Sequence, residues 1–263
     1  MKIILNEEGY EEKAYRKAYS AVLRDKKRFE WMLRGIENEQ SLERKVQLAK
    51  VAASFAVHNN PGYFSSTVLE ETFIEYAQQH DITSYNITYQ KNSFLHVMTQ
   101  AYVTGGHTRV VERWIDVSPE TQIHSVIILN QKDVTVPKRL EEVIKNKNGT
   151  LTLFDKKLSD LNRALKLREI GLHYQYIILH VHMDDPTALI AFGTEKFTRP
   201  IIYYNHADHL FSLGGSIADK FADLRTITSI TRTRKLIKEP YMLGVPMENK
   251  TMATITKDTA RKK

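Results

Sequence analysis

The chain has 263 residues, of which 42% are hydrophobic and 26% charged, an ordinary balance for a folded globular protein that argues against disorder. No stretch approaches the roughly 18–20 consecutive apolar residues of a transmembrane helix, and the absence of cysteine excludes disulfides, thiolate nucleophiles and cysteine-ligated zinc. The net charge of +7 is scattered among acidic residues along most of the chain, so we expect no nucleic-acid partner.

Helical periodicity dominates residues 10–80. Along the best-marked helix, apolar residues recur at steps of three and four and so share one face: Leu42, Val46, Ala49, Ala53 and Ala56. Pro61 and Gly62 break this helix. A second helix is predicted over residues 66–79, with Ser65 or Ser66 as its N-cap. We therefore predict a helical N-terminal extension over residues 1–90.

From about residue 94 the pattern changes to short, β-branched apolar runs. These are FLHVM (94–98), HSVIIL (124–129), LTLF (151–154), YIILHV (176–181), PIIYY (200–204) and a weaker LRTITSI (224–230). Helical patterns lie between them. Strands that are apolar throughout are buried on both faces, and their alternation with helices favours a parallel sheet. We predict a doubly wound, mostly parallel, Rossmann-like α/β domain over residues 91–245 and a linker or tail over residues 246–263.

Ligands of such sheets bind at the carboxyl ends of the strands, so the segments after the strands hold the candidate site residues. The first is TGGHTR, after the strand at 94–98. Gly105 and Gly106 let the backbone approach a ligand closely, and the helix start that follows, with His107 and Thr108, offers free N–H groups to an anion. A plain tight turn would use the same two glycines, and the dinucleotide-binding GxGxxG pattern is absent.

The second segment is HVHMDDP, at the end of the most apolar strand. Alternation along a strand places His180 and His182 on the same side. Asp184 or Asp185 can cap the helix that Pro186 begins. Paired imidazoles at the end of a buried strand favour a chemical role for both histidines.

The third segment is NHADH, directly after PIIYY. The segment begins with Asn205, and its two histidines and one acid, His206, Asp208 and His209, can transfer protons or ligate a metal, or the segment can form a simple polar turn. Because histidines follow three strands of one sheet, we expect the five imidazoles to converge on one rim: His107, His180, His182, His206 and His209.

A metal-dependent hydrolase is one alternative. The spacing of His180, His182 and Asp184 resembles the HxHxDH motif of the metallo-β-lactamases, to which His206 and His209 would add ligands. Asp185, however, stands where that motif has histidine, and a parallel sheet differs from that antiparallel sandwich. We therefore expect no metal.

In chain order, three segments resemble the N-terminal domain of bacterial GT-B glycosyltransferases: LHVMTQAYVTGGHTRVVERWI, IILHVHMDDPTALIAF and RPIIYYNHADHLFSLGGSIAD. The helical segment KVQLAKVAASFAVHNNPGYFSSTVLEETFIEYA is similar to the leader ahead of that domain. The resemblance spans about residues 40–245. It implies transfer of a sugar from an activated, usually nucleotide-linked, donor to a glycan, lipid or protein acceptor that this half binds.

The resemblance also implies roles for the three segments. Gly105, Gly106, His107 and Thr108 would lie near the donor phosphate. His180, His182 or His206 would bind the transferred sugar or act as a base. The acceptor side would be lined by Asn205, Asp208 and His209.

The family's donor-binding domain has a Glu-x7-Glu pattern. Glu112 and Glu120 have that spacing, but they lie in the wrong half of the fold. We therefore expect the donor domain to be missing from this chain or supplied by a partner chain. A further alternative is a non-catalytic module, derived from a glycosyltransferase, that binds a sugar or a nucleotide or serves as a scaffold. No cofactor is expected besides the donor substrate. The apolar run at the N-terminus is too short for a signal peptide, so we expect a cytoplasmic location, with peripheral membrane contact left open.

Overall fold

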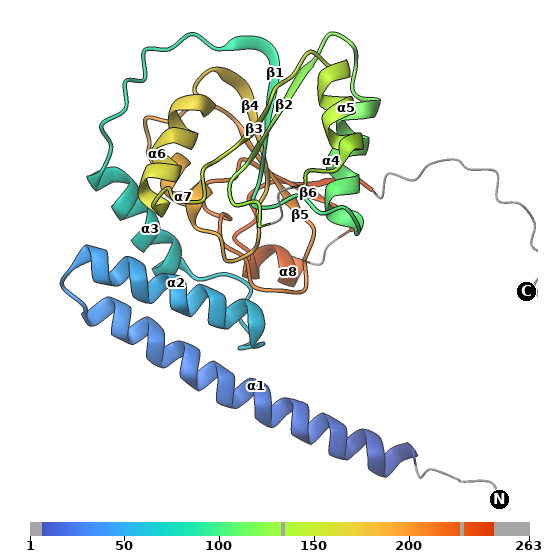
Figure 1. The fold of residues 1–263 in the computed structure, drawn as a ribbon. Helices are drawn as coiled ribbons and strands as arrows, with labels where there is room; N and C mark the ends of the chain where they lie inside the picture. The colour runs from blue at the N-terminus through green and yellow to red at the C-terminus, as the bar shows by residue number, and fades with distance from the viewer. Residues whose placement is uncertain (1–6, 133–134, 227–228, 245–263) are drawn as a thin grey trace, which may run out of the picture.

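The computed structural model describes residues 7–132, 135–226 and 229–244 (Figure 1). Three helices come first: α1 (Glu7–Asn38), α2 (Leu42–His58) and α3 (Thr67–Gln79). Strands and helices then alternate: β1 (Gln90–Met98), α4 (Gly106–Val117), β2 (Ile123–Ile128), α5 (Lys138–Asn146), β3 (Leu151–Leu153), α6 (Asp160–Gly171), β4 (Tyr174–His180), α7 (Thr187–Phe192), β5 (Ile201–Asn205), β6 (Lys220–Asp223), α8 (Ser229–Arg234) and β7 (Pro240–Met242).

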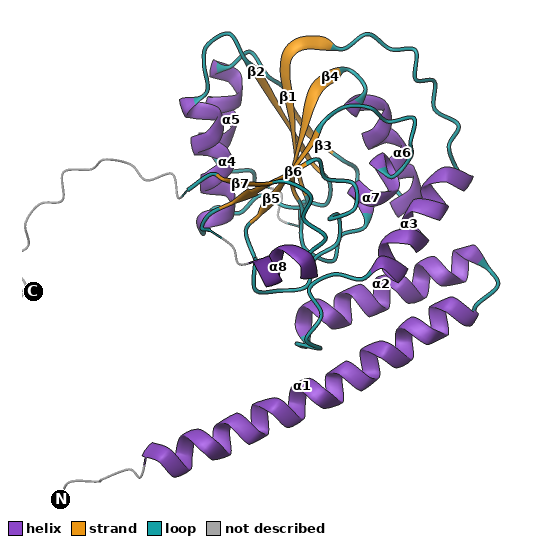
Figure 2. Cartoon of the chain, turned by 180° about the vertical axis from the view of Figure 1, so that it is seen from behind, coloured by secondary structure: helices purple, strands orange, loops and turns teal. Residues whose placement is uncertain are grey.

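The seven strands form one sheet in the order β3-β2-β1-β4-β5-β6-β7, and every neighbouring pair is parallel (Figure 2). The chain builds outward from β1 to β3, then returns to the other side of β1 with β4 and builds outward again. This is the strand order of a doubly wound, Rossmann-like sheet, whose direction reverses between β1 and β4. The predicted fold class is confirmed.

Helices cover both faces of the sheet (Figure 1). On one face, α4 and α5 pack on apolar side chains of β1 and β2, among them Met98, Val126 and Ile128. On the other face, α3, α6 and α7 cover the larger core, which holds Leu95, Leu179 and their neighbours. Successive strand residues point to opposite faces, so each buried strand supplies side chains to both cores.

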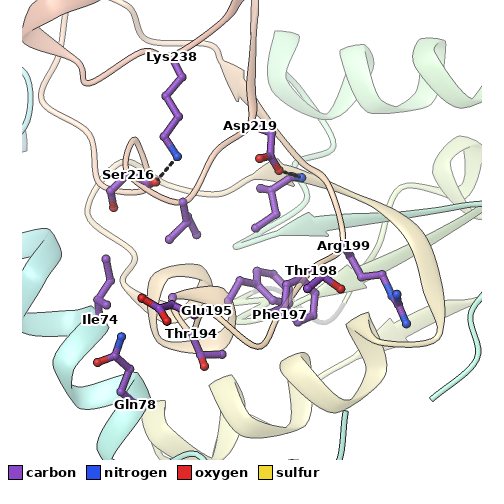
Figure 3. A pocket seen from close by; sticks show the side chains of 14 residues that line it. Ile74, Gln78, Thr194, Glu195, Phe197, Thr198, Arg199, Ser216, Asp219 and Lys238 are labelled. Atoms are coloured by element: carbon purple, nitrogen blue, oxygen red, sulfur yellow. Dashed lines mark hydrogen bonds between the residues drawn. The ribbon is translucent and has the colours of Figure 1, made fainter. Parts of the chain in front are cut away.

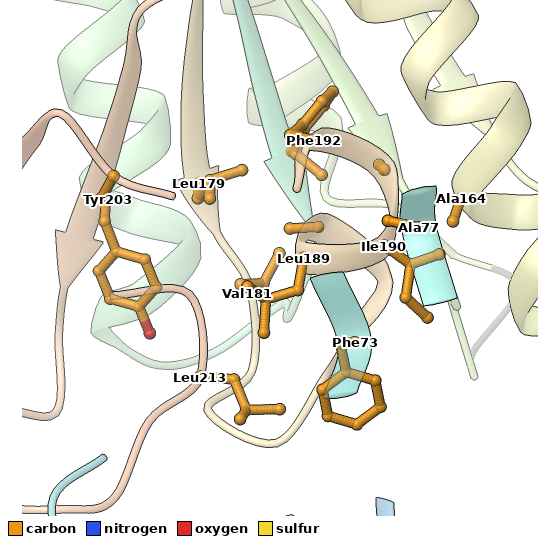
Figure 4. Close-up of a cluster of buried hydrophobic side chains, with 14 of the residues drawn as sticks. Phe73, Ala77, Ala164, Leu179, Val181, Leu189, Ile190, Phe192, Tyr203 and Leu213 are labelled. Atoms are coloured by element: carbon orange, nitrogen blue, oxygen red, sulfur yellow. The ribbon is translucent and has the colours of Figure 1, made fainter. Parts of the chain in front are cut away.

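The N-terminal helices share the larger core with the sheet. Figure 4 shows Phe73 and Ala77 of α3 beside Leu189 and Ile190 of α7, and all four side chains are fully or almost fully buried. The small residues of α2 let it pack closely on this layer, and α1 packs on α2 from outside. Ser66 caps α3 as predicted, because its hydroxyl accepts a hydrogen bond from the Leu69 N–H.

The strand predicted over residues 224–230 is wrong. The strand in that region, β6, is Lys220–Asp223, where Phe221 and Ala222 are buried, and Ser229–Arg234 is the helix α8. Only two apolar residues mark β6, whereas the alternation in LRTITSI imitates a strand. Residues 227–228 and the predicted tail over residues 246–263 lie outside the described parts of the chain. Within those parts, no helix combines the length and apolarity needed to cross a bilayer.

Candidate functional site

A cleft of about 590 Å³ opens at the carboxyl ends of β1 and β4, where the direction of the sheet reverses. Open parallel sheets bind their ligands at this position. The loops after the strands supply most of the wall, and α2 and α6 add charged side chains. The lining includes Thr99, Tyr102, His107, Lys132, His182 and His206.

The glycine loop leads from β1 into α4 and borders the cleft. Gly105 has φ +107°, a conformation that L side chains rarely adopt, and a Cβ at either Gly105 or Gly106 would meet open space. No side chain caps α4 at Gly105. Thr108 is buried, and its hydroxyl accepts a hydrogen bond from the Tyr102 N–H at 2.7 Å, which closes the loop. The first turn of α4 therefore leaves N–H groups for an anion.

The loop after β4 forms the opposite wall. The His182 Nε2 atom and the Tyr102 hydroxyl are hydrogen-bonded at 2.9 Å. The Thr99 hydroxyl accepts from the His182 N–H at 2.9 Å and donates to the Asp185 carboxylate at 2.6 Å. Asp185 also accepts from the N–H of Thr187, the first residue of α7, at 2.9 Å. These bonds tie β1 to β4 across the reversal. Neither predicted aspartate is the N-cap of α7 itself, which is Pro186.

Three more imidazoles gather beneath and beside this loop. The His107 and His206 ring centroids are 4.6 Å apart, and the His107 and His180 rings are 6.3 Å apart. The Tyr204 ring lies 5.3 Å from His180 and 5.8 Å from His206. Three buried ring nitrogens in this group have no hydrogen-bond partner among the described residues: His107 Nε2, His180 Nδ1 and His206 Nδ1.

His180 lies under the cleft rather than in its wall, because its side chain is fully buried. Its Nε2 atom is 3.0 Å from Nδ1 of His96, and Nε2 of His96 is 2.9 Å from Nδ1 of His124. The sequence reasoning did not single out His96 and His124, which sit inside apolar strand runs. Their signal is a histidine on each of three neighbouring strands, offset by two residues from one strand to the next, which keeps the side chains on one face of the sheet.

Burial keeps these imidazoles neutral. It lowers the pKa of His206 to about 4 and of His107 to about 3, below the ordinary 6.5. Burial also lowers the pKa of His182, although the Asp185 and Asp184 carboxylates partly oppose this effect. The pKa of the fully buried His180 is lowered for the same reason, with further contributions from neighbouring histidines. A neutral imidazole has a free lone pair and can accept a proton.

The third predicted segment divides between two places. Asn205 and Asp208 line a neighbouring cavity of about 190 Å³ together with His206 and Asp223. The buried Asn205 amide donates to the Asp223 carboxylate at 2.7 Å. His209 is exposed, and its Nδ1 atom lies 3.5 Å from the Asp208 carboxylate. Of the five imidazoles expected on one rim, four gather at the cleft, whereas the exposed His209 is not part of its lining.

Sequence reasoning also missed a buried cation next to this segment. The Lys235 ammonium donates to the Ser212 hydroxyl at 3.0 Å and to the Ala207 carbonyl at 3.1 Å, and burial lowers its pKa to about 8. Nothing in the sequence signals this burial, because the place of Lys235 in the fold depends on the turn after α8.

The hydrolase alternative has no geometric support. Among residues 7–132, 135–226 and 229–244, no three His, Asp or Glu side chains are placed to hold a metal ion. His180 pairs with His96 and His182 with Tyr102, so the two histidines of the apparent motif face different partners.

A second cavity, of about 410 Å³, lies at the opposite end of the sheet, before β5 and β7 (Figure 3). Polar side chains there are engaged with the backbone: Asp219 accepts from the Ile201 N–H at 2.7 Å, and Lys238 donates to the Ser216 carbonyl at 2.9 Å. This cavity holds no histidine. The carboxyl-end cleft is therefore the better candidate site.

Comparison with known proteins adds little to this geometry. No family model matches the chain, and no curated protein sequence matches it. Among solved structures, a variant O-GlcNAc transferase from Thermobaculum terrenum is similar at 10% sequence identity and a TM-score of 0.40. The match covers 76% of this chain and 38% of that one, so the chain spans well under half of the compared structure.

Proposed function

We propose that this chain is the acceptor-side half of a GT-B glycosyltransferase, which moves a sugar from a nucleotide-linked donor to a hydroxyl of a glycan, lipid or protein. One observation carries the proposal: neutral imidazoles of His107, His182 and His206 line a cleft at the β1/β4 reversal, beside the glycine-led start of α4.

The chemistry of sugar transfer needs a proton acceptor on this side of the cleft. The acceptor oxygen forms a bond to the anomeric carbon, the bond from that carbon to the phosphate oxygen breaks, and the hydroxyl proton passes to a base. His206 and His182 are the candidate bases, because both line the cleft and the lowered pKa values keep them unprotonated at neutral pH. His180 is fully buried beneath the cleft and does not contact the acceptor itself.

The leaving group is a nucleoside diphosphate, and its charge needs compensation. In this proposal the uncapped first turn of α4, at Gly105 and Gly106, faces the phosphates, and Lys132 adds positive charge to the cleft wall. A donor-binding domain or a partner chain would hold the nucleotide itself. The reaction would use no metal or cofactor bound by this half.

Calorimetric titration of the purified chain tests this division of labour. Soluble glycan acceptors are expected to bind weakly and UDP- or GDP-sugars hardly at all.

In an assay of nucleoside diphosphate release with a donor-binding domain present, His206→Ala and His180→Ala should abolish transfer. His173→Ala is the matched control, since this exposed histidine precedes β4 at the other end of the sheet. Tight donor binding to the chain alone, or full transfer by both variants, contradicts the proposal. Acceptor binding without transfer favours the non-catalytic module.

A further inference from the structure

A line of hydrogen-bonded imidazoles crosses the sheet beneath the cleft. It runs from Gln122 through His124 on β2 and His96 on β1 to His180 on β4, with distances of 3.2 Å, 2.9 Å and 3.0 Å between the bonded atoms. The parallel register explains the alignment: Phe94 pairs with His124 and Met98 with His180, so the three histidines lie on a diagonal across one face.

The packing around this line leaves the rings little freedom. All three histidines are fully buried. The His124 ring stacks on Phe94 with the ring centroids 4.7 Å apart, and Trp114 makes T-shaped contacts with the rings of His96 and His180 at centroid distances of 5.8 Å each. Each imidazole therefore keeps one orientation, and each bond in the line joins one N–H to one lone pair.

The groups at the two ends of the line, Gln122 and Nδ1 of His180, decide which ring nitrogen of each histidine carries the proton. The Gln122 side-chain oxygen accepts, so the proton of His124 is on Nε2 and its Nδ1 atom accepts from Nε2–H of His96. His96 Nδ1 then accepts from Nε2–H of His180. The opposite direction would place an N–H on His180 Nδ1, which has no partner among the described residues, and buried N–H groups are seldom left unpaired.

We infer that His96 and His124 are positioning residues that hold His180 with its proton on Nε2 and a lone pair on Nδ1, beside the His107 and Tyr204 rings. This inference deepens the proposed function and rests on it for its role. When an imidazole of the cleft takes the acceptor proton, the fixed lone pair of His180 faces the positive charge that forms. A freely exchanging tautomer would present an N–H half of the time and oppose it.

Nitrogen-15 NMR of histidine-labelled, ligand-free protein reads the tautomer directly. The wild-type His180 signals should show a protonated Nε2 and an unprotonated Nδ1. His124→Asn places an amide oxygen near the former Nδ1 position and should keep this pattern. His124→Phe preserves the aromatic contact with Phe94 but removes the acceptor, so either direction then leaves one buried N–H without a partner, and His180 should become a mixture of the two tautomers.

The outcomes separate this inference from the transfer reaction, because the NMR measurement needs no substrate. A wild-type His180 protonated on Nδ1, or a His124→Phe variant with an unchanged tautomer, overturns it. If His124→Phe does not fold, Gln122→Leu removes the terminal acceptor instead, at a half-buried position directly before β2, and should also populate the second form. In the transfer assay, His124→Phe should lose activity at least tenfold, and His124→Asn should restore most of it.

Discussion

Replacing Arg168 with methionine removes a cation that joins three helices of the larger core. Arg168 on α6 is completely buried. Its guanidinium donates to the carbonyls of Ala77 at the end of α3 and of Ile190 and Ala191 in α7, at 3.2, 2.6 and 2.6 Å. It also donates to the Asp81 carboxylate at 2.9 Å. Methionine fills a similar volume but satisfies none of these acceptors.

The expected cost follows from what the substitution leaves behind. Breaking a buried ion pair by removing one partner costs about 3–5 kcal/mol, because the other charge stays desolvated. Asp81 keeps hydrogen bonds from the Tyr85 hydroxyl and the Thr83 N–H and an ion pair with Lys196, which limits its share of the loss. The carbonyls of Ile190 and Ala191, however, lose the guanidinium donor that binds each of them at 2.6 Å. We therefore expect Arg168→Met to lower the free energy of unfolding by about 4 kcal/mol.

Urea denaturation followed by circular dichroism measures this loss. Arg163→Met is the matched control on the same helix. Arg163 is also largely buried, but its guanidinium bonds are local, to Asp160 at 3.0 Å and to the Leu158 carbonyl at 3.1 Å. We expect it to cost about 1–2 kcal/mol. An Arg168→Met variant no less stable than Arg163→Met would refute the clamp between α3, α6 and α7.

Three further predictions concern the cleft. Because the pKa values of His107 and His206 are about 3 and about 4 in the folded chain against 6.5 ordinarily, the unfolded chain binds protons first as the pH falls. Stability should therefore decrease from pH 6.5 to about pH 4 in urea titrations, and a His107→Gln/His206→Gln variant should flatten this slope. Gly105→Ala should cost about 1 kcal/mol of backbone strain in thermal unfolding, whereas Gly106→Ala, with ordinary helical φ, should cost none. Asp185→Ala should cost about 1–2 kcal/mol because two hydrogen bonds to its carboxylate are lost, while alanine at position 184 should be neutral.

The strands of the sheet could be predicted because burial on both faces leaves an unbroken apolar run. YIILHV shows this pattern, and β4 forms there. β6 could not be found in this way. It is four residues long and begins with an exposed lysine, and its assignment depends on pairing with β5, a contact between residues far apart in sequence.

The candidate site could be predicted from the sequence only where polar side chains directly follow a strand. The ends of β1, β4 and β5 supplied His107, His182 and His206, and the parallel topology brought them together. The buried partners were missed for a physical reason. A histidine inside an apolar strand, such as His96, looks like an isolated substitution until the register shows which imidazole lies beside it.

The N-terminal helices keep part of the larger core away from solvent. Leu69 and Phe73 of α3 and the alanines of α2 belong to the same core as Leu189 on α7. Removing residues 1–90 would expose the apolar side chains of the larger core that α2 and α3 cover. We expect the remaining sheet domain to self-associate through this surface rather than fold alone. Any graft of this sheet onto another protein must therefore carry its helices as part of the transplanted unit.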